Sequence, residues 1–362
     1  MIPTRVRLRR ATASRTLFAP TILPEALTRL GFVQADPIRA PARAQDLTLR
    51  HRVSGYRAGD LERSYPGLDL EEGFLVNYGF VPRDIHALMH PRSRLGPWPA
   101  PGRRTADAVL AFVLARGRAH PREVDAHFAH GSVTNYWGGS SSATTHLLEH
   151  LHYRGLLRVA GREGGIRIYA PPVPAVPATG APESRARLDA LVDVMVRTYA
   201  PLPSATLSWL LNRLRLGVPQ WEADIRPALA RAKRRLAHAR VEGIDWYWPG
   251  DEPLAMREVD DTVRLLAPFD PIVWDRRRFS VLWGWDYRFE AYTPAPQRKF
   301  GYYALPVLWR DRVIGWANLS LKDDRLQAAL GYVAGRVPRG RAFARALDEE
   351  LARVQWFLRR GT

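Results

Sequence analysis

The apolar positions of this chain recur mainly at the three-to-four-residue spacing of amphipathic helices, and in a few short stretches they alternate with polar residues as strands do. The middle of the chain shows both patterns in succession. Helical spacing extends over 106–115, 120–124 and 141–152, and two alternating runs at 155–160 and 166–170 follow around a glycine-rich turn. Three helices followed by a β-hairpin predict a winged helix, a module that serves nucleic-acid binding or protein interaction.

The segments that flank this module are also rich in helical spacing but are less regular. On the C-terminal side the expected elements are helices at 185–199, 204–214 and 221–240 and a strand at 244–248. On the N-terminal side the expected elements are helices at 23–30, 40–50, 59–65 and 84–90. Three consecutive helix-rich modules of similar length predict tandem winged helices, which are helix-turn-helix domains.

The tail of the chain has a different composition. From 263 to 321 it is rich in aromatic and β-branched residues, which favour strands. Two apolar runs at 302–309 and 313–319 flank a charged turn and predict a hairpin, whereas 279–285 fits either a strand or a helix. A helix at 341–358 closes the chain. We therefore expect an α+β protein in which tandem winged helices precede a C-terminal β-rich, barrel-like domain.

Proline-rich breaks divide the chain. They lie at 93–102, 171–177 and 249–253, and the first two have the composition of stiff linkers. A length of 362 residues also favours several domains. The domains expected from these breaks are 1–98, 103–172, 182–250 and 258–362.

Near the N-terminus a carboxamide and a carboxylate stand two residues apart inside the apolar run 30–38. In an extended segment Gln34 and Asp36 project from the same face. Burying a carboxylate among apolar side chains is unfavourable unless something pairs or uses it, so we take the two residues as a candidate site. The alternative is structural, because an aspartate directly before a proline, here Pro37, is a common helix start at which the carboxylate caps the first turn.

The chain is strongly basic, with 54 lysine and arginine residues against 36 acidic ones, a net charge of +18 and a pI near 10.8. A polyanion is therefore the first partner to consider. All but three of the basic residues are arginines, which suit bidentate phosphate contacts, although a GC-rich genome is an alternative reason for the excess.

A single basic run is usually a solvated face, but several runs in one chain favour a phosphate-lining role for at least one of them. The segment 287–299, which mixes aromatic, proline and basic residues, fits equally a structural loop and a DNA-contacting loop. The candidate DNA contacts are Arg39, Arg43, Arg50, Arg276, Arg277, Arg278, Arg298 and Lys299.

Some classes of chemistry find little support in the composition. The absence of cysteine excludes disulfides, thiolate zinc sites and cysteine nucleophiles. His146 and His150 lie one helical turn apart, a spacing that metals use, but Glu149 points elsewhere on the helix and nothing else completes a shell, so we expect no metal and no cofactor. No signal peptide or membrane-spanning apolar run is evident, and we expect a cytoplasmic protein.

Three segments resemble the signature of the AlkZ/YcaQ (AlkX)-type winged-helix DNA glycosylases. They are 31–49, which contains the Gln34 and Asp36 pair, 268–278 and 287–306. The resemblance covers essentially the whole chain. It implies three tandem winged helices and a C-terminal β-rich domain that form a curved, basic surface for duplex DNA. It also implies excision of N7-alkylated guanines and unhooking of DNA interstrand crosslinks.

The resemblance further implies roles for the candidate residues. Family members carry a Gln-x-Gln or a Gln-x-Asp pair, and this chain has the second form as Gln34 and Asp36. Asp36 is then expected to oppose the positive charge of an oxocarbenium-like sugar and to take a proton from water, while Gln34 orients water or sugar. The chain departs from the family at 74–82, where relatives have a histidine before a Leu-Pro pair and this chain has none, so any role of that histidine does not carry over.

Because none of the three lysines is near Asp36 in sequence, we expect a monofunctional hydrolase that leaves an abasic site. Its expected partner is double-stranded DNA with alkylated or crosslinked bases, bound by a monomer at the bacterial nucleoid. Two alternatives remain open at this stage. A winged-helix transcription regulator predicts sequence-specific binding without base release, and a metal hydrolase built on the histidines predicts loss of activity with a chelator.

Overall fold

The computed structural model describes residues 3–92, 100–129, 131–134, 140–254 and 260–359. The chain forms two compact units, each built from segments that are distant in sequence. The first unit consists of Met1–Asp60, Leu191–Asn212 and Arg226–Thr362, and the second of Leu61–Ala190 and Arg213–Ile225. The division into four domains therefore stays a prediction about the order of modules along the chain. The proline-rich break at 93–102, which separates the first two predicted domains, lies almost wholly outside the described residues.

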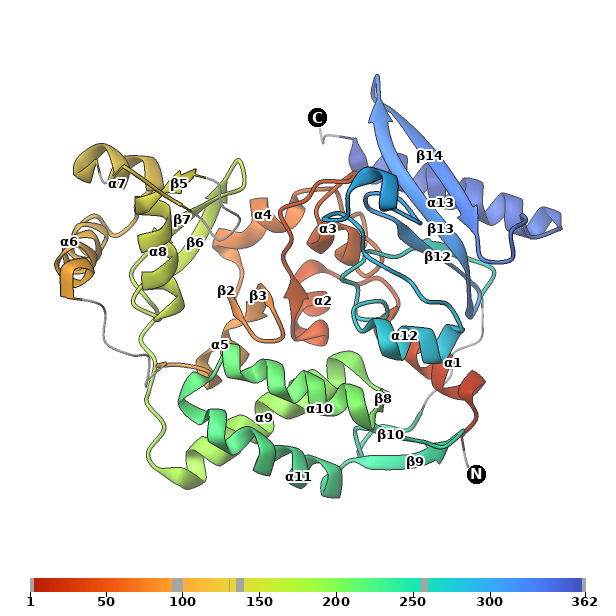
Figure 1. The fold of residues 1–362 in the computed structure, drawn as a ribbon, viewed down its shortest axis with the longest axis horizontal. Coiled ribbons are helices and arrows are strands. Elements are labelled where there is room, and N and C mark those ends of the chain that lie inside the picture. Colours follow the sequence, from red (N-terminus) through yellow and green to blue (C-terminus); the bar gives the residue numbers. More distant parts are fainter. Residues whose placement is uncertain (1–2, 93–99, 130, 135–139, 255–259, 360–362) are drawn as a thin grey trace. The chain divides into compact units, whose positions relative to one another are not determined.

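The first unit contains a four-stranded antiparallel sheet in the order β11-β12-β13-β14 (Figure 1). These strands are Val263–Leu265, Leu305–Trp309, Arg312–Lys322 and Arg325–Tyr332. Gly315 and Gly331 let β13 and β14 approach closely, because a Cβ on Gly315 would lie 2.0 Å from the Gly331 carbonyl oxygen. The sheet has two free edges, β11 and β14, so the expected barrel-like closure is not present.

Helices cover this sheet and extend the core of the first unit. The helix α13 packs against β11 and β14, and α12 contacts α1 (Figure 1). A second core cluster joins Leu8, Trp246 and Leu282. The helices of this unit are α1 (Arg5–Thr16), α2 (Leu23–Leu30), α3 (Ala44–Leu49), α10 (Ser204–Arg213), α11 (Ile225–Arg235), α12 (Arg276–Trp283) and α13 (Arg341–Leu358), together with the second half of α9 (Ala181–Tyr199). Its short strands are β1 (Val33–Gln34), β8 (Leu202–Pro203), β9 (Ala237–Val241) and β10 (Ile244–Trp248), of which the last three form one sheet.

The second unit contains the expected succession of three helices and a hairpin. The helices are α6 (Ala100–Arg116), α7 (Pro121–Phe128) and α8 (Ala143–Tyr153), and the hairpin strands are β6 (Arg158–Glu163) and β7 (Ile166–Ala170). Its other elements are α4 (Asp60–Ser64), β2 (Leu70–Phe74), β3 (Tyr78–Pro82), α5 (Arg83–Leu88), β4 (Ser132–Thr134) and β5 (Ser140–Ser142). The order of elements agrees with the prediction, while the assignment as a winged helix stays a prediction.

Two arginines of the β6–β7 hairpin bind carboxylates inside the second unit. Arg162 forms an ion pair of 2.6 Å with the fully buried Glu72, and Arg158 forms one of 3.0 Å with Glu71. Removing one partner of either pair would leave the other charge buried and uncompensated, which is strongly destabilising. The folded unit therefore depends on both members of each pair. The hairpin therefore uses part of its positive charge for packing.

One predicted helix is wrong in the first unit. The segment 221–240 is not continuous, because a short 3-10 helix (Pro219–Asp224), α11 and the strand β9 share it. β9 pairs with β10, with Ala239 opposite Trp246, and this hairpin pairing overrides the helical pattern. The sequence also gave no indication of α1, β14 or the β2–β3 hairpin. None of the described helices is both long and apolar enough to cross a membrane.

Candidate active site

Gln34 and Asp36 follow a sharp end of α2 in the first unit. Gly31 ends the helix in the left-handed conformation (φ 66°), and its N–H donates to the Leu27 carbonyl at 2.9 Å. The chain then turns into β1 with Phe32 and Val33 in the core, each 2% exposed. This short extended segment presents Gln34 as the last residue of the strand.

Asp36 lies in a turn and not at a helix start. No helix begins at Pro37, and the next one, α3, starts at Ala44. The Asp36 carboxylate oxygen Oδ1 instead accepts the Ile38 backbone N–H at 2.9 Å, which is the geometry of an Asx turn. The helix-cap alternative is therefore wrong, and the carboxylate holds a local turn with one of its two oxygens.

Burial dominates the electrostatics of Asp36. The residue is only 8% exposed, and this burial raises the pKa of the Asp36 carboxyl, while the hydrogen bond from Ile38 acts in the opposite direction. Among the described residues, no side chain donates a hydrogen bond to the second oxygen, Oδ2. A carboxylate that is poorly solvated and has one uncommitted oxygen is suited to take up a proton or to face a positive charge.

A tryptophan fixes the orientation of Gln34. The indole Nε1 of Trp274 donates to Gln34 Oε1 at 3.0 Å. Because an indole N–H can only donate, it selects the carbonyl end of the carboxamide, and the NH₂ end of Gln34 is turned away from it. Trp274 in turn stacks between Tyr199, at 5.2 Å between ring centroids, and Trp209, at 4.6 Å. The column of three rings opens to solvent at Trp209, which is 45% exposed.

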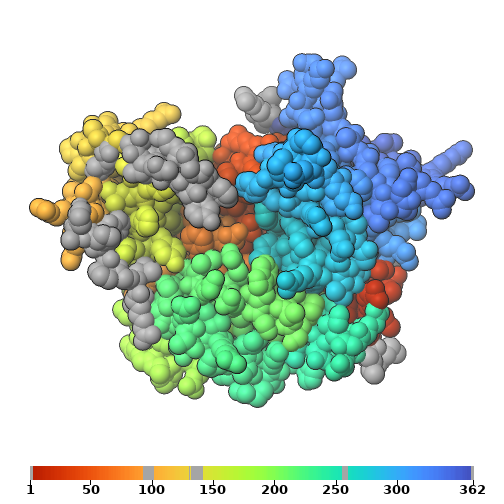
Figure 2. All heavy atoms as spheres, in the orientation of Figure 1, coloured from red at the N-terminus to blue at the C-terminus, as the bar shows by residue number. Residues whose placement is uncertain are grey.

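Two tyrosines lie within electrostatic range of Asp36. Burial, and after it the negative charge of Asp36, raises the pKa of both Tyr303 and Tyr292. Tyr303 is 2% exposed and packs edge-on against Phe289 at 5.4 Å, whereas Tyr292, which also contacts Phe289, is 70% exposed. Both belong to the segment between α12 and β12, which reaches the molecular surface (Figure 2). We call Gln34, Asp36, Trp274, Tyr292 and Tyr303 the Gln-Asp site.

The predicted DNA contacts fall into two groups. Arg39, Arg277 and Lys299 are exposed, and Arg43 and Arg298 are half-buried. Arg298 donates to the Thr293 carbonyl at 2.8 Å and lies over the ring of Tyr302 at 5.0 Å. These five positions are accessible to a ligand to differing degrees and stay candidates for phosphate contact.

Three other arginines of that prediction have interior partners. Arg278 is fully buried and donates to the carbonyls of Tyr199, Pro271 and Ile272. The half-buried Arg276 donates to the Pro268 carbonyl at 2.7 Å. The expectation for Arg278 is therefore wrong, because its guanidinium anchors backbone carbonyls and cannot reach a phosphate.

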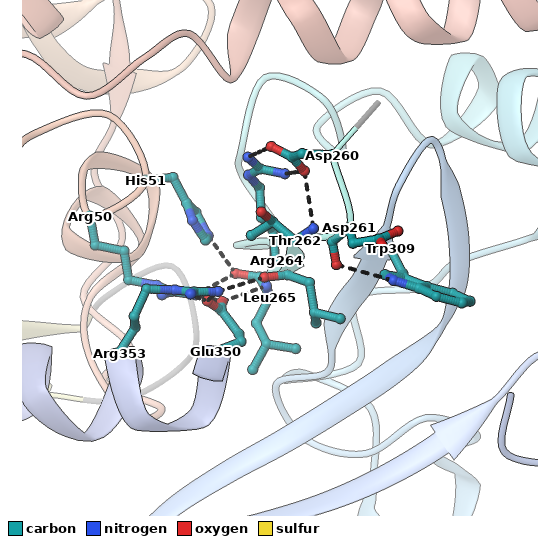
Figure 3. A network of polar contacts seen from close by, with 11 residues as sticks. Arg50, His51, Asp260, Asp261, Thr262, Arg264, Leu265, Trp309, Glu350 and Arg353 are labelled. Atoms are coloured by element: carbon teal, nitrogen blue, oxygen red, sulfur yellow. Dashed lines mark hydrogen bonds and ion pairs between the residues drawn. The ribbon is translucent and has the colours of Figure 1, made fainter. Parts of the chain in front are cut away.

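Arg50 is likewise structural. Its side chain is 4% exposed and forms an ion pair of 2.6 Å with Glu350, which also accepts the backbone N–H of Leu265 at 2.8 Å (Figure 3). Arg353 approaches the same carboxylate from α13, and His51 lies against the Leu265 carbonyl. This network joins α3, β11 and α13, so the expectation that Arg50 contacts DNA is also wrong.

Sequence reasoning gave no role to several residues of the site. Trp274 and Tyr303 lie inside the segments that carry the family resemblance, and this was the available signal. Trp209 lies outside them and had none. Among the described residues, no three histidine, aspartate or glutamate side chains converge in an arrangement that would hold a metal ion.

Comparison with known proteins identifies the family of the chain. A family model described as "DNA glycosylase AlkZ-like" matches residues 27–357 of the chain. The chain belongs to the AlkZ-like DNA glycosylase family. It is thus a DNA-repair enzyme that cleaves N-glycosyl bonds in DNA. The fold is similar to that of Streptomyces sahachiroi DNA glycosylase AlkZ, with a TM-score of 0.62, 16% sequence identity and coverage of 98% of this chain and 97% of that one.

Proposed function

We propose that this AlkZ-like enzyme is a monofunctional glycosylase that hydrolyses the N-glycosidic bond of N7-alkylated purines in duplex DNA and unhooks interstrand crosslinks formed through such bases. The observation that carries the proposal is the environment of Asp36. Asp36 is 8% exposed, its carboxylate has one oxygen without a donor among the described residues, and two positions before it Trp274 orients the carboxamide of Gln34.

The chemistry of the lesion explains why a carboxylate suffices. Alkylation at N7 makes the purine cationic and therefore a good leaving group, so the base needs little acid assistance. The remaining barrier is the formation of an oxocarbenium-like sugar and the delivery of water to its anomeric carbon. Asp36 opposes the charge on the sugar and accepts a proton from the attacking water.

Gln34 orients the reactants without adding charge. Because Trp274 holds its carbonyl oxygen, the NH₂ group of Gln34 is the end available to donate to water or to the sugar. A neutral donor does not compete with Asp36 for the positive charge that develops on the sugar. In this mechanism the neutral Gln34 orients the reactants, and the ionisable Asp36, two positions later, supplies the negative charge.

Hydrolysis without strand cleavage follows from the lysine content. A β-lyase step needs an amine that forms a Schiff base with the sugar. None of the three lysines, Lys233, Lys299 and Lys322, is near Asp36 in sequence, and Lys233 donates to Ser204 Oγ at 2.9 Å. We expect no protein–DNA adduct on borohydride trapping, and detection of such an adduct would overturn the monofunctional part of the proposal.

We assign duplex binding to the accessible basic side chains. The protein is proposed to bind DNA as a monomer. Arg39, Arg43, Arg277, Arg298 and Lys299 supply positive charge in the first unit, and each contact to a phosphate releases counterions. A crosslinked base is tied to both strands, so it cannot be swung out as a free nucleotide in the usual way. We therefore expect an open groove of the protein to approach the lesion from outside the base stack.

A duplex with one N7-methylguanine tests the proposal. After incubation with the protein, heating in alkali breaks the strand wherever a base has been released. Breaks at the modified guanine, together with free methylguanine, support the glycosylase. Binding without any base release would instead favour a DNA-binding regulator.

A further inference from the structure

The hydroxyl of Tyr303 is a buried donor without a partner. It is excluded from solvent and forms no hydrogen bond to the described residues, although Tyr303 is 2% exposed and belongs to the core. Leaving a buried hydroxyl unsatisfied is unfavourable, so such groups are rare in folded proteins. A free donor of this kind points to a role that the resting structure does not fulfil.

The backbone that carries Tyr303 is held rigidly. The buried Glu290 accepts the Phe300 backbone N–H at 2.7 Å, and the Asn318 side chain donates to the Phe300 carbonyl at 2.7 Å. Gly301 has φ 111°, and a Cβ there would lie 2.5 Å from Asn318 Oδ1. With the preceding backbone fixed on both sides, the free hydroxyl of Tyr303 is a consequence of the fold and not of a loose loop.

A free acceptor lies within electrostatic range of this donor. Among the charged groups that act on Tyr303, Asp36 has the largest effect, followed by Tyr287, Arg276 and Tyr292. Oδ1 of Asp36 accepts the Ile38 N–H, and Oδ2 receives no donor from the described residues. The protein thus places an unused donor within electrostatic range of an unused acceptor.

DNA would make this pairing necessary. A sugar and its phosphates pressed against Asp36 would remove the remaining water and add negative charge, and both effects favour the protonated acid, which cannot act as a base. We propose that Tyr303 is a positioning residue whose hydroxyl donates to Oδ2 of Asp36 when DNA covers the site, and so keeps that carboxylate ionised and oriented. This inference rests on the proposed function, in which Asp36 is the base.

The donor remains available across the useful pH range. Burial, followed by the charge of Asp36, raises the pKa of Tyr303 well above its ordinary value, so the phenol stays protonated at neutral and mildly alkaline pH. The groups that face Asp36 from the packed elements are the Ile38 N–H, Tyr292 and Tyr303, and Arg276 faces Tyr303 from α12. Because the pKa values of Tyr292 and Tyr303 are both raised, these two phenols stay protonated near neutrality.

The test is the pH profile of Tyr303→Phe, with Tyr302→Phe as the control because Tyr302 is adjacent but 44% exposed. Single-turnover release of N7-methylguanine is measured from about pH 5 to about pH 9 for the three proteins. For Tyr303→Phe we expect the acid limb to move up by about one pH unit, giving roughly a tenfold loss below it and a rate within about threefold of wild type above it. The Tyr302→Phe profile should coincide with that of wild type.

Two outcomes overturn the inference. One is an unchanged acid limb in Tyr303→Phe, and the other is an equal loss of rate at every pH, which a purely structural role would give. Folding is checked by thermal unfolding, where loss of an unpartnered hydroxyl should leave the midpoint unchanged or higher. A lower midpoint would show that the hydroxyl has a structural partner and would also contradict the inference.

A second readout does not depend on turnover. The ¹³C signal of the Asp36 carboxyl, assigned by its absence from Asp36→Asn, is titrated with an undamaged duplex bound. Its midpoint should be higher in Tyr303→Phe than in wild type, and equal midpoints would refute the role of Tyr303. Failure of wild type to release methylguanine would refute the proposed function, so the two failures are distinguishable.

Discussion

The indole N–H of Trp274 donates to the side-chain oxygen of Gln34 at 3.0 Å, which joins two segments 240 residues apart in sequence. The contact occupies the carbonyl end of the carboxamide, and in the proposed mechanism the NH₂ end faces the substrate. Replacing Trp274 with phenylalanine keeps a ring in the column with Tyr199 and Trp209 but removes the donor. We expect the rate of methylguanine release to fall about tenfold, as for one lost positioning contact.

The control for this change is Trp209→Phe, because Trp209 belongs to the same column and forms no hydrogen bond to Gln34 in the described structure. Its rate should stay within about threefold of wild type. Thermal unfolding of both variants separates loss of orientation from loss of packing. Full activity of Trp274→Phe would show that the orientation of Gln34 is unimportant.

The burial of Asp36 predicts a variant that is more stable but inactive. The raised pKa of Asp36 means that the folded state binds this proton more tightly than the unfolded state. Stability therefore falls as pH rises from the ordinary aspartate pKa through the raised one, and the penalty is fully present at neutral pH. Asp36→Asn removes the charge and keeps an acceptor for the Ile38 N–H, so we expect a gain of about 0.5–2 kcal/mol at pH 7.

Unfolding in urea at several pH values checks this gain. The difference between Asp36→Asn and wild type should shrink as the pH falls below the raised pKa, because wild type then carries the neutral acid. A variant that is less stable than wild type at pH 7 would show that the ionised carboxylate stabilises the fold.

Asp270, which lies in another of the segments that resemble the family, stabilises the fold through its charge, whereas the buried charge of Asp36 is expected to destabilise it. Asp270 and Arg52 are both fully buried and form a bidentate pair at 2.8 and 3.0 Å, and Asp270 Oδ1 also accepts the Ile272 N–H. Asp270→Asn leaves the buried guanidinium uncompensated and should cost about 3–5 kcal/mol of unfolding free energy. The same urea series measures it, with Asp36→Asn as the matched substitution, and a loss below about 1 kcal/mol would contradict the structural role.

The accessible cations should control the salt dependence of DNA binding. Replacing Arg39, Arg277 or Lys299 with glutamine removes one phosphate contact and should reduce the slope of log K against log salt by about one each. Arg345→Gln, on the exposed side of α13, is the control and should leave the slope unchanged. Titration of a fluorescent duplex at several salt concentrations gives these slopes, and unchanged slopes in all three variants would place the DNA surface elsewhere.

The sequence predicted elements that depend on local pattern. The final helix has the predicted bounds, Arg341–Leu358, because its apolar positions recur regularly up to the end. The helix predicted at 221–240 was wrong because its last residues form β9, which pairs in a hairpin with β10, the strand predicted at 244–248. Helical spacing alone does not exclude such pairing.

The same limit applies to the candidate site. Asp36 was detectable because a carboxylate in an apolar run is unusual. Arg277 and Arg278 look equivalent in sequence, yet the first is exposed and the second is fully buried, because only the folded backbone brings the carbonyls of Tyr199 and Pro271 to Arg278. Burial of single members of a charged run depends on tertiary structure.

The central claim is that the Asp36 carboxylate acts on the sugar of a damaged nucleotide. Its most direct test is single-turnover release of N7-methylguanine by wild type and by Asp36→Asn, with both proteins saturated with the same duplex. We predict a loss of at least about a hundredfold in the variant, as for a lost general base, with duplex affinity within about threefold of wild type. Release by Asp36→Asn at the wild-type rate would contradict the account.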